Sequence, residues 1–128
     1  LAKDIMVSGK KMPIIDSKKS FNQALTVMNQ KKLGIVVIVK NKFIKGLITD
    51  GDLRRFLNKP SKERSLDKII RSYPFVINEN MSASKALAIM NEKKITSLLV
   101  VSDNDYKKSN KILKGIIHIH FLLKNEAQ

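Results

Sequence analysis

Two side chains in this chain have the types and spacing for binding chemistry: Thr49 and Asp52, in the stretch Gly46-Leu-Ile-Thr-Asp-Gly-Asp52. An apolar segment runs directly into a short helical pattern there, so Thr49 has the position of a helix N-cap and Asp52 that of its capping-box partner. A hydroxyl and a carboxylate beside the free N–H groups of a helix start can also hold a phosphate or a ribose. Helix capping alone and ligand binding are both open at this point.

The surrounding pattern predicts that this junction ends a β-α-β-β-α unit. A short apolar strand at Ile14-Ile15 precedes a helix that begins after Ser20, which has a capping-box Gln three positions later. Residues 35–39 form a fully apolar run that is typical of a buried strand. Asn41-Lys42 then predicts a tight turn into an antiparallel strand over residues 43–48.

The same plan recurs in the second half of the chain. Residues 24–33, which read Ala-Leu-Thr-Val-Met-Asn-Gln-Lys-Lys-Leu, are matched by residues 86–95, which read Ala-Leu-Ala-Ile-Met-Asn-Glu-Lys-Lys-Ile, an offset of 62 residues from Ala24 to Ala86. Gly46-Leu47-Ile48 likewise returns as Gly115-Ile116-Ile117. The chain is therefore an internal duplication.

This duplication predicts an α+β fold of two pseudo-symmetric β-α-β-β-α repeats. We assign residues 1–60, with a lead-in helix, to the first repeat and residues 61–128 to the second. One copy of about 50 residues would be only marginally stable by itself, so we expect the repeats to pack through their sheets.

Composition places the chain among compact globular proteins, with 43% hydrophobic residues and no cysteine. The absence of cysteine excludes disulfides and thiolate chemistry. The apolar runs are far shorter than the roughly 20 residues needed to span a bilayer, and the first residues lack the apolar segment of a signal peptide. We therefore expect a cytoplasmic protein without a membrane partner.

The net charge of +14 can reflect binding to nucleic acid, to an anionic membrane or to small anionic ligands, or only the base composition of the genome. Lysine doublets are spread along the whole chain, and there are only five Phe, two Tyr and no Trp. A nucleic-acid binder would more often show a basic stripe interleaved with stacking aromatic rings, so this class is disfavoured.

The repeat and its Thr-Asp-Gly-Asp junction resemble a pair of cystathionine β-synthase (CBS) motifs, also called a Bateman module. Among such modules the chain is similar to the C-terminal regulatory region of bacterial D-arabinose 5-phosphate isomerases, which act in Kdo (3-deoxy-D-manno-octulosonate) and lipopolysaccharide biosynthesis. CBS pairs of sugar nucleotidyltransferases look alike at the first junction and remain an alternative. The similarity rests on Asp4-Ile5-Met6, Lys32-Leu33-Gly34, Ile48-Thr49-Asp50-Gly51-Asp52-Leu53-Arg54-Arg55, Lys94-Ile95-Thr96-Ser97 and Gly115-Ile116-Ile117-His118-Ile119-His120-Phe121-Leu122-Leu123.

The resemblance implies a regulatory module rather than a catalyst, because the sugar-isomerase domain of that family would precede Leu1. It implies no catalytic residue and no required cofactor, but a regulatory ligand: an adenine nucleotide (AMP or ATP) or the end product CMP-Kdo. It also implies a homodimer formed through the CBS pairs. The alternative function is a structural dimerisation module that binds no ligand.

In CBS pairs the ligand lies in clefts between the repeats, and this implies a first site around Thr49 and Asp52. Arg54 and Arg55, one turn further on, have the chemistry to bind a phosphate, with a solvated helix face as the equal alternative. The walls of this cleft would be formed by Ile14, Ile15, Gly34 and Ile35.

The second site departs from the family pattern, because Phe121 stands where an acid is expected and cannot accept hydrogen bonds from a ribose. The polar candidates there are Thr96, Ser97, His118 and His120. The two histidines would face an anion, or simply pack. A metal site is disfavoured, because zinc requires three or four ligands and no cysteine or carboxylate cluster completes the set.

Overall fold

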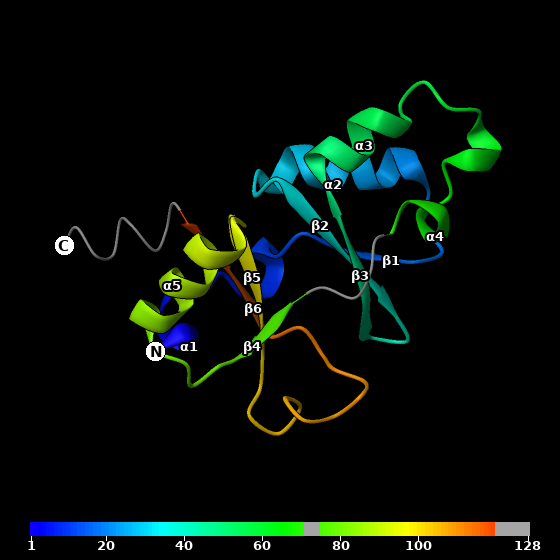
Figure 1. Ribbon diagram of the computed structural model, residues 1–128. Helices are drawn as coiled ribbons and strands as arrows, with labels where there is room; N and C mark the ends of the chain where they lie inside the picture. The colour runs from blue at the N-terminus through cyan, green and yellow to red at the C-terminus, as the bar shows by residue number, and fades with distance from the viewer. Residues whose placement is uncertain (71–74, 120–128) are drawn as a thin grey trace. The chain divides into compact units, whose positions relative to one another are not determined.

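The computed structural model describes residues 1–70 and 75–119, and these form two compact units, each with a three-stranded sheet (Figure 1). The continuous unit is Pro13–Pro74. The two-segment unit joins Leu1–Met12 to Phe75–Gln128. Helices and strands are mixed in both, which confirms the predicted α+β class.

The continuous unit has strand order β1-β2-β3, with β1 parallel to β2 and β2 antiparallel to β3. Helix α2 makes the crossover between the two parallel strands, and α3 follows β3 without a loop. The elements are β1 (Ile14–Asp16), α2 (Phe21–Lys31), β2 (Ile35–Lys40), β3 (Phe43–Thr49), α3 (Asp50–Phe56), the 3-10 helix η2 (Ser61–Glu63) and α4 (Leu66–Ile69).

Local chemistry explains the two ends of α2. The hydroxyl of Ser20 accepts a hydrogen bond from the backbone N–H of Gln23 at 3.1 Å, and the side chain of Gln23 accepts one from the N–H of Ser20 at 2.9 Å. This reciprocal capping box satisfies two of the unpaired N–H groups of the first turn, as predicted. Phe21 and Met28 are buried on one face, and the helix ends at Lys32 in a left-handed conformation.

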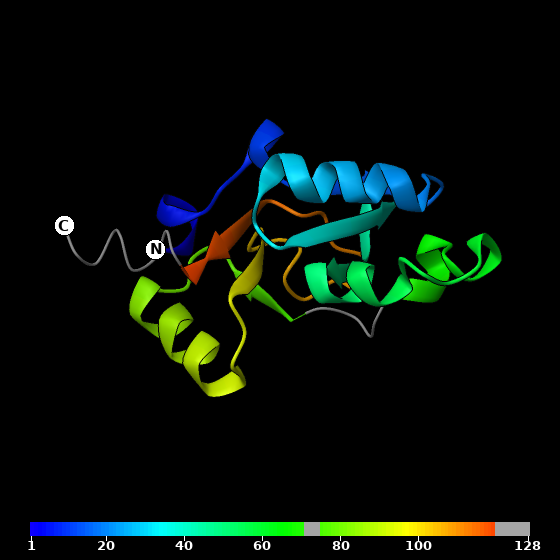
Figure 2. The same cartoon turned by 90° about the horizontal axis from the view of Figure 1, so that it is seen from above.

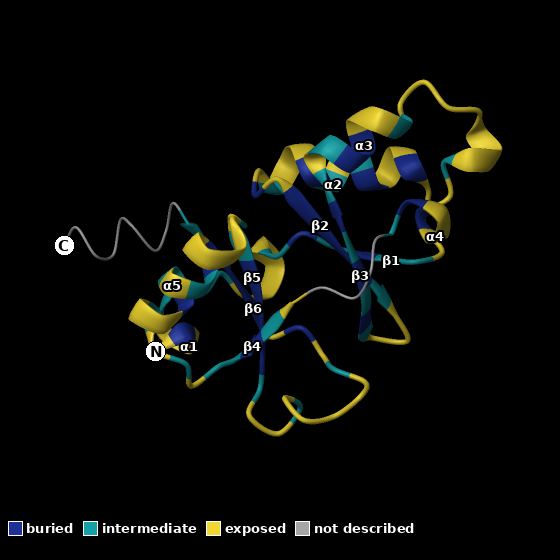
Figure 3. Cartoon of the chain, in the orientation of Figure 1, coloured by how far each residue is buried: buried dark blue, intermediate teal, exposed yellow. Residues whose placement is uncertain are grey.

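The turn between β2 and β3 is the tight hairpin that Asn41-Lys42 predicts. Both residues have positive φ angles, of 50° and 68°, as a type I′ turn requires. The strands bring Val36, Ile38 and Ile48 into one hydrophobic core with α2, α3 and α4. Figure 3 shows β2 buried along most of its length, with the hairpin turn exposed.

The two-segment unit repeats this topology with strand order β4-β5-β6. β4 is parallel to β5, and β5 is antiparallel to β6. Ile77, Leu98 and Ile117 on the strands form its core with Ala86 and Met90 on α5. The elements are α1 (Ala2–Ile5), the 3-10 helix η1 (Gly9–Lys11), β4 (Val76–Asn78), α5 (Ala83–Lys93), β5 (Ser97–Val101) and β6 (Gly115–His118).

Each lead-in helix packs in the unit that the other repeat supplies. The packed units therefore have different boundaries from the sequence repeats 1–60 and 61–128. Val7 and Ile116 pair through two backbone hydrogen bonds of 2.8 and 2.9 Å, which extend the edge of β6. Figure 2 shows the N-terminal segment, in blue, beside the orange-red strand β6. The N–H of Ala2 also donates to the carbonyl of Met81 at 2.6 Å. Reciprocally, α4 of the second repeat buries Leu66 in the core of the continuous unit.

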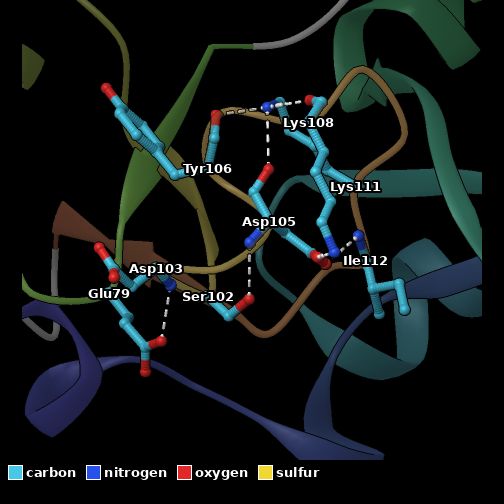
Figure 4. A network of polar contacts seen from close by, with 8 residues as sticks. All are labelled: Glu79, Ser102, Asp103, Asp105, Tyr106, Lys108, Lys111 and Ile112. Carbon is cyan, nitrogen blue, oxygen red and sulfur yellow. Dashed lines mark hydrogen bonds and ion pairs between the residues drawn. The ribbon is translucent and has the colours of Figure 1, made fainter.

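The polar loop between β5 and β6 is organised by one lysine. The ammonium of Lys111 donates to the carbonyl oxygens of Asp105 at 3.1 Å and Tyr106 at 2.5 Å, and also to that of Lys108 (Figure 4). The carboxylate of Asp105 accepts a hydrogen bond from the N–H of Ile112 at 3.1 Å, which lowers its pKa. The loop thus closes on itself around one ammonium group.

Candidate functional site

The junction of β3 and α3 has the predicted capping box. The hydroxyl of Thr49 accepts a hydrogen bond from the N–H of Asp52 at 3.1 Å, and the carboxylate of Asp52 accepts one from the N–H of Thr49 at 3.0 Å. Thr49 has extended backbone angles, as an N-cap residue should, and α3 begins at the next residue. Helix capping is therefore established at this junction, and it leaves ligand binding open.

Asp52 is more enclosed than the sequence indicates. Its side chain is only 2% exposed, and its second oxygen forms an ion pair with the guanidinium of Arg55, whose own side chain is 56% exposed. A carboxylate removed from water in this way needs such partners, because an unpaired buried charge is strongly unfavourable. Both oxygens of Asp52 therefore already have partners, one at the N-cap residue Thr49 and one at Arg55 on the same helix.

The two arginines of α3 have different surroundings. Arg54 pairs with Asp50 one helical turn earlier, and both side chains are largely exposed, at 69% and 52%. Such an exposed pair contributes little to stability and exchanges readily with another anion. Arg55, in contrast, connects solvent with the buried carboxylate of Asp52.

The structure brings Gly34 and Ile35 to the junction. Ile35 is the direct strand partner of Thr49, and the carbonyl oxygen of Gly34 accepts a hydrogen bond from the N–H of Asp50 at 3.0 Å. Gly34 has a φ of 74°, a conformation that other residues adopt at a cost. These contacts close the start of β2 against the start of α3.

Ile14 and Ile15 lie on β1, one strand away from this contact. Ile14 pairs with Val37 rather than with Ile35, and Ile15 is buried in the core of the continuous unit. Ile14 is partly exposed, whereas Ile15 is only 7% exposed. Of the two, Ile14 is therefore the residue with surface available as a wall.

A shallow cavity of about 240 Å³ lies beside the junction. Sequence reasoning did not select Asn29, Lys32 or Asp50, which contribute to its lining. Their positions in the sequence could have indicated this, because the last turn of α2 leads into Gly34 and Asp50 directly follows Thr49. The cavity is lined by Met28, Asn29, Lys32, Gly34 and Asp50.

The second junction mirrors the first in its backbone. Ser97 pairs with His118 across β5 and β6, in the register that Ile35 and Thr49 have in the continuous unit. His118 is 9% exposed, and within the described part of the chain the hydroxyl of Ser97 is buried without a hydrogen-bond partner. Thr96 is exposed, and its carbonyl oxygen accepts a hydrogen bond from the N–H of Ile119 at 2.9 Å.

Other expectations for the second junction concern His120 and Phe121, which lie outside the described residues. In residues 1–70 and 75–119 no three His, Cys, Asp or Glu side chains come together as metal ligands would. Within the same ranges, no helix has the length and apolar character to cross a bilayer.

The fold and the duplicated junction define a class of protein, and comparison with known families identifies it. The model of the CBS domain family matches this chain twice, at residues 2–59 and 66–123. The chain therefore belongs to the CBS domain family, as a tandem pair, and is a regulatory domain.

Relatives and a solved structure extend this result. An uncharacterized protein of Rickettsia prowazekii (strain Madrid E) is 37% identical over 122 residues, which cover 94% of this chain and 36% of that protein. Arabinose 5-phosphate isomerase KdsD of Escherichia coli (strain K12) is 32% identical over 124 residues, covering 94% of this chain and 36% of the isomerase. The chain thus spans about a third of the length of these relatives.

The fold comparison agrees. The structure of CBSX2 in complex with AMP has a TM-score of 0.83 at 19% identity and covers 99% of this chain and 96% of that one. The tandem CBS fold predicted from the sequence is confirmed.

Proposed function

We propose that this CBS pair is the ligand-sensing regulatory part of an arabinose 5-phosphate isomerase. The similarity to the Escherichia coli enzyme over 94% of this chain supports the proposal, and it favours an isomerase over a sugar nucleotidyltransferase. In this proposal the parent protein carries a sugar-isomerase domain, works in the cytoplasm in Kdo and lipopolysaccharide synthesis, and forms a homodimer through its CBS pairs.

The proposed regulatory ligand is an adenine nucleotide or CMP-Kdo, bound at the junction of β3 and α3. One observation carries this: Thr49 and Asp52 bracket the first turn of α3 beside Gly34 and the cavity of about 240 Å³. A hydroxyl, a carboxylate and a close backbone approach are what a ribose phosphate needs. The AMP complex of CBSX2 supports the adenine nucleotide.

Binding would exchange the partners of Arg55. In the structure its guanidinium forms an ion pair with one carboxylate oxygen of Asp52. A ribose hydroxyl would replace the guanidinium at that oxygen, and Arg55, freed from Asp52, would pair with the phosphate of the ligand. The ligand would thereby favour one arrangement of α3, which is the requirement for passing a signal to a neighbouring domain.

Calorimetric titration of the chain with AMP, ATP, CMP and CMP-Kdo tests the proposal and separates the two ligand classes. We expect saturable heat with AMP and ATP, or with CMP-Kdo. Heat with CMP alone equal to that with CMP-Kdo would show that the sugar acid is not recognised. No heat with any of the four would contradict ligand sensing.

The second candidate is a structural dimerisation module without a ligand. The burial of Asp52 and its pairing with Arg55 favour it, because the site satisfies its own polar groups. A chain that dimerises with unchanged affinity in the presence and absence of all four nucleotides would support this alternative.

A further inference from the structure

A second and larger cavity lies in the continuous unit, at the opposite end of α2 from the junction cavity. Its volume of about 380 Å³ is within the range of small-molecule sites. Its residues come from the loop after β1, the first turn of α2, η2 and the start of α4. They are Ser17, Lys18, Lys19, Ser20, Phe21, Asn22, Ser61, Arg64, Ser65, Leu66 and Asp67.

The lining of this cavity is cationic. Lys18, Lys19 and Arg64 contribute three positive charges, and four serine hydroxyls accompany them. Asp67 is the one acid in the lining, and it is already paired with Lys45 at 2.5 Å. The unbalanced charge of the cavity is therefore positive, and serine hydroxyls beside such charges are typical neighbours of a bound oxyanion.

Two contacts position the guanidinium of Arg64, which still has an N–H group without an acceptor in the described part of the chain. Its guanidinium stacks over the ring of Phe21, 5.2 Å from the ring centre, and its Nη1 donates a long hydrogen bond of 3.4 Å to the carbonyl of Leu57. Its Nε is buried and, among the residues that the structure describes, has no hydrogen-bond partner. A buried N–H without an acceptor is unfavourable, and a small movement of the Arg64 side chain would bring this N–H to an anion bound in the cavity.

We propose that this cavity binds a phosphate group, either free or as the ester of a small phosphorylated metabolite. A guanidinium fixed by stacking has the planar fork that recognises phosphate, and two flexible ammonium groups add charge. The site uses none of the residues of the Thr49 junction, so it does not depend on the regulatory ligand proposed there.

The test uses the whole chain labelled with ¹⁵N, titrated with inorganic phosphate, ribose 5-phosphate and uncharged ribose. Both phosphates should shift the Arg64 Nε–H resonance downfield and move the amides of residues 17–22, and ribose should move neither. Equal affinity for the two phosphates would assign the cavity to the phosphate group alone. Tighter binding of the ester would show that the cavity also receives the sugar, and both results support the proposal.

Two variants locate the site, and one variant controls for charge. Lys18→Gln with Lys19→Gln should weaken phosphate binding at least tenfold, and Arg64→Lys, which keeps the charge but lacks Nε–H, several-fold. Lys59→Gln with Lys107→Gln removes the same charge from exposed positions outside the cavity and should leave the affinity within twofold. Equal losses in the control, shifts confined to residues 49–55, or no binding of either phosphate would overturn the proposal.

Discussion

Gly115 at the start of β6 lies directly against Met6, the residue that follows α1. A Cβ at position 115 would lie 2.9 Å from the Cβ of Met6 and closer still to its sulfur atom. This contact fastens the N-terminal segment to the sheet of the two-segment unit, next to the pairing of Val7 with Ile116. The packing of the N-terminal segment on β6 therefore requires a glycine at position 115.

Gly115→Ala should destabilise the chain by about 1–3 kcal/mol, because Met6 must move away from β6. Gly51→Ala is the matched control, since its Cβ would meet only ordinary contacts at 3.6 and 3.8 Å. In helix α3 that change should be neutral or stabilise by up to about 1 kcal/mol. Urea unfolding of both variants gives the comparison, and a Gly115→Ala chain as stable as wild type would show that α1 is not held there.

Asp52→Asn should weaken nucleotide binding at least tenfold while keeping an oxygen that can accept the N–H of Thr49. The reason is that the amide loses the charge and half of the acceptor capacity offered to ribose hydroxyls. Calorimetry with AMP measures the loss. Asp4→Asn, at an exposed position outside the junction, is the control. If Asp52→Asn and Asp4→Asn bound AMP with equal affinity, Asp52 would not be a ligand-binding residue.

Arg55→Gln tests the exchange of partners at Asp52. Without Arg55, the phosphate of AMP has no guanidinium to pair with. The carboxylate of Asp52, however, no longer has to break an ion pair before it accepts a ribose hydroxyl. The affinity for AMP should therefore fall at least tenfold relative to the affinity for adenosine, which lacks the phosphate. An unchanged ratio of the two affinities would mean that Arg55 stays on Asp52 in the complex.

The ion pair between Lys45 and Asp67 should make stability depend on acid pH. The hydrogen bond from Lys45, and secondly its charge, lower the pKa of Asp67. Because the folded pKa lies below the unfolded one, this contribution is complete above the usual aspartate pKa and is lost as the pH falls through the lowered value. Carboxyl NMR titration should show the Asp67 pKa return toward normal in Lys45→Gln. A normal pKa in wild type would refute the pairing.

Lys111→Met should loosen the loop between β5 and β6 without unfolding the sheet. The methionine side chain is unbranched and only one atom shorter, but it cannot donate to the carbonyl oxygens of Asp105, Tyr106 and Lys108. We expect faster chymotryptic cleavage after Tyr106 and a melting temperature close to that of wild type. Lys107→Met, at an exposed neighbour, should cleave like wild type, and equal rates in the two variants would contradict the role of Lys111.

The sequence by itself determined the local features of this protein. Ser20 and Thr49 cap their helices with partners three residues away, and Asn41-Lys42 adopts its turn, because these interactions lie within one short segment. The duplication and the Thr-Asp-Gly-Asp junction were enough to predict the family and the class of fold.

Only the tertiary structure decided which segments meet. Packing and side-chain placement decide three features of this protein. They are the exchange of α1 and α4 between the units, the ion pair between Arg55 and Asp52, and the cavity around Arg64. Sequence spacing permitted Arg55 to face solvent or a ligand equally well, and nothing within a few residues of Arg64 indicates that it stacks on Phe21. Such contacts depend on burial and on long-range packing, which spacing along the chain does not encode.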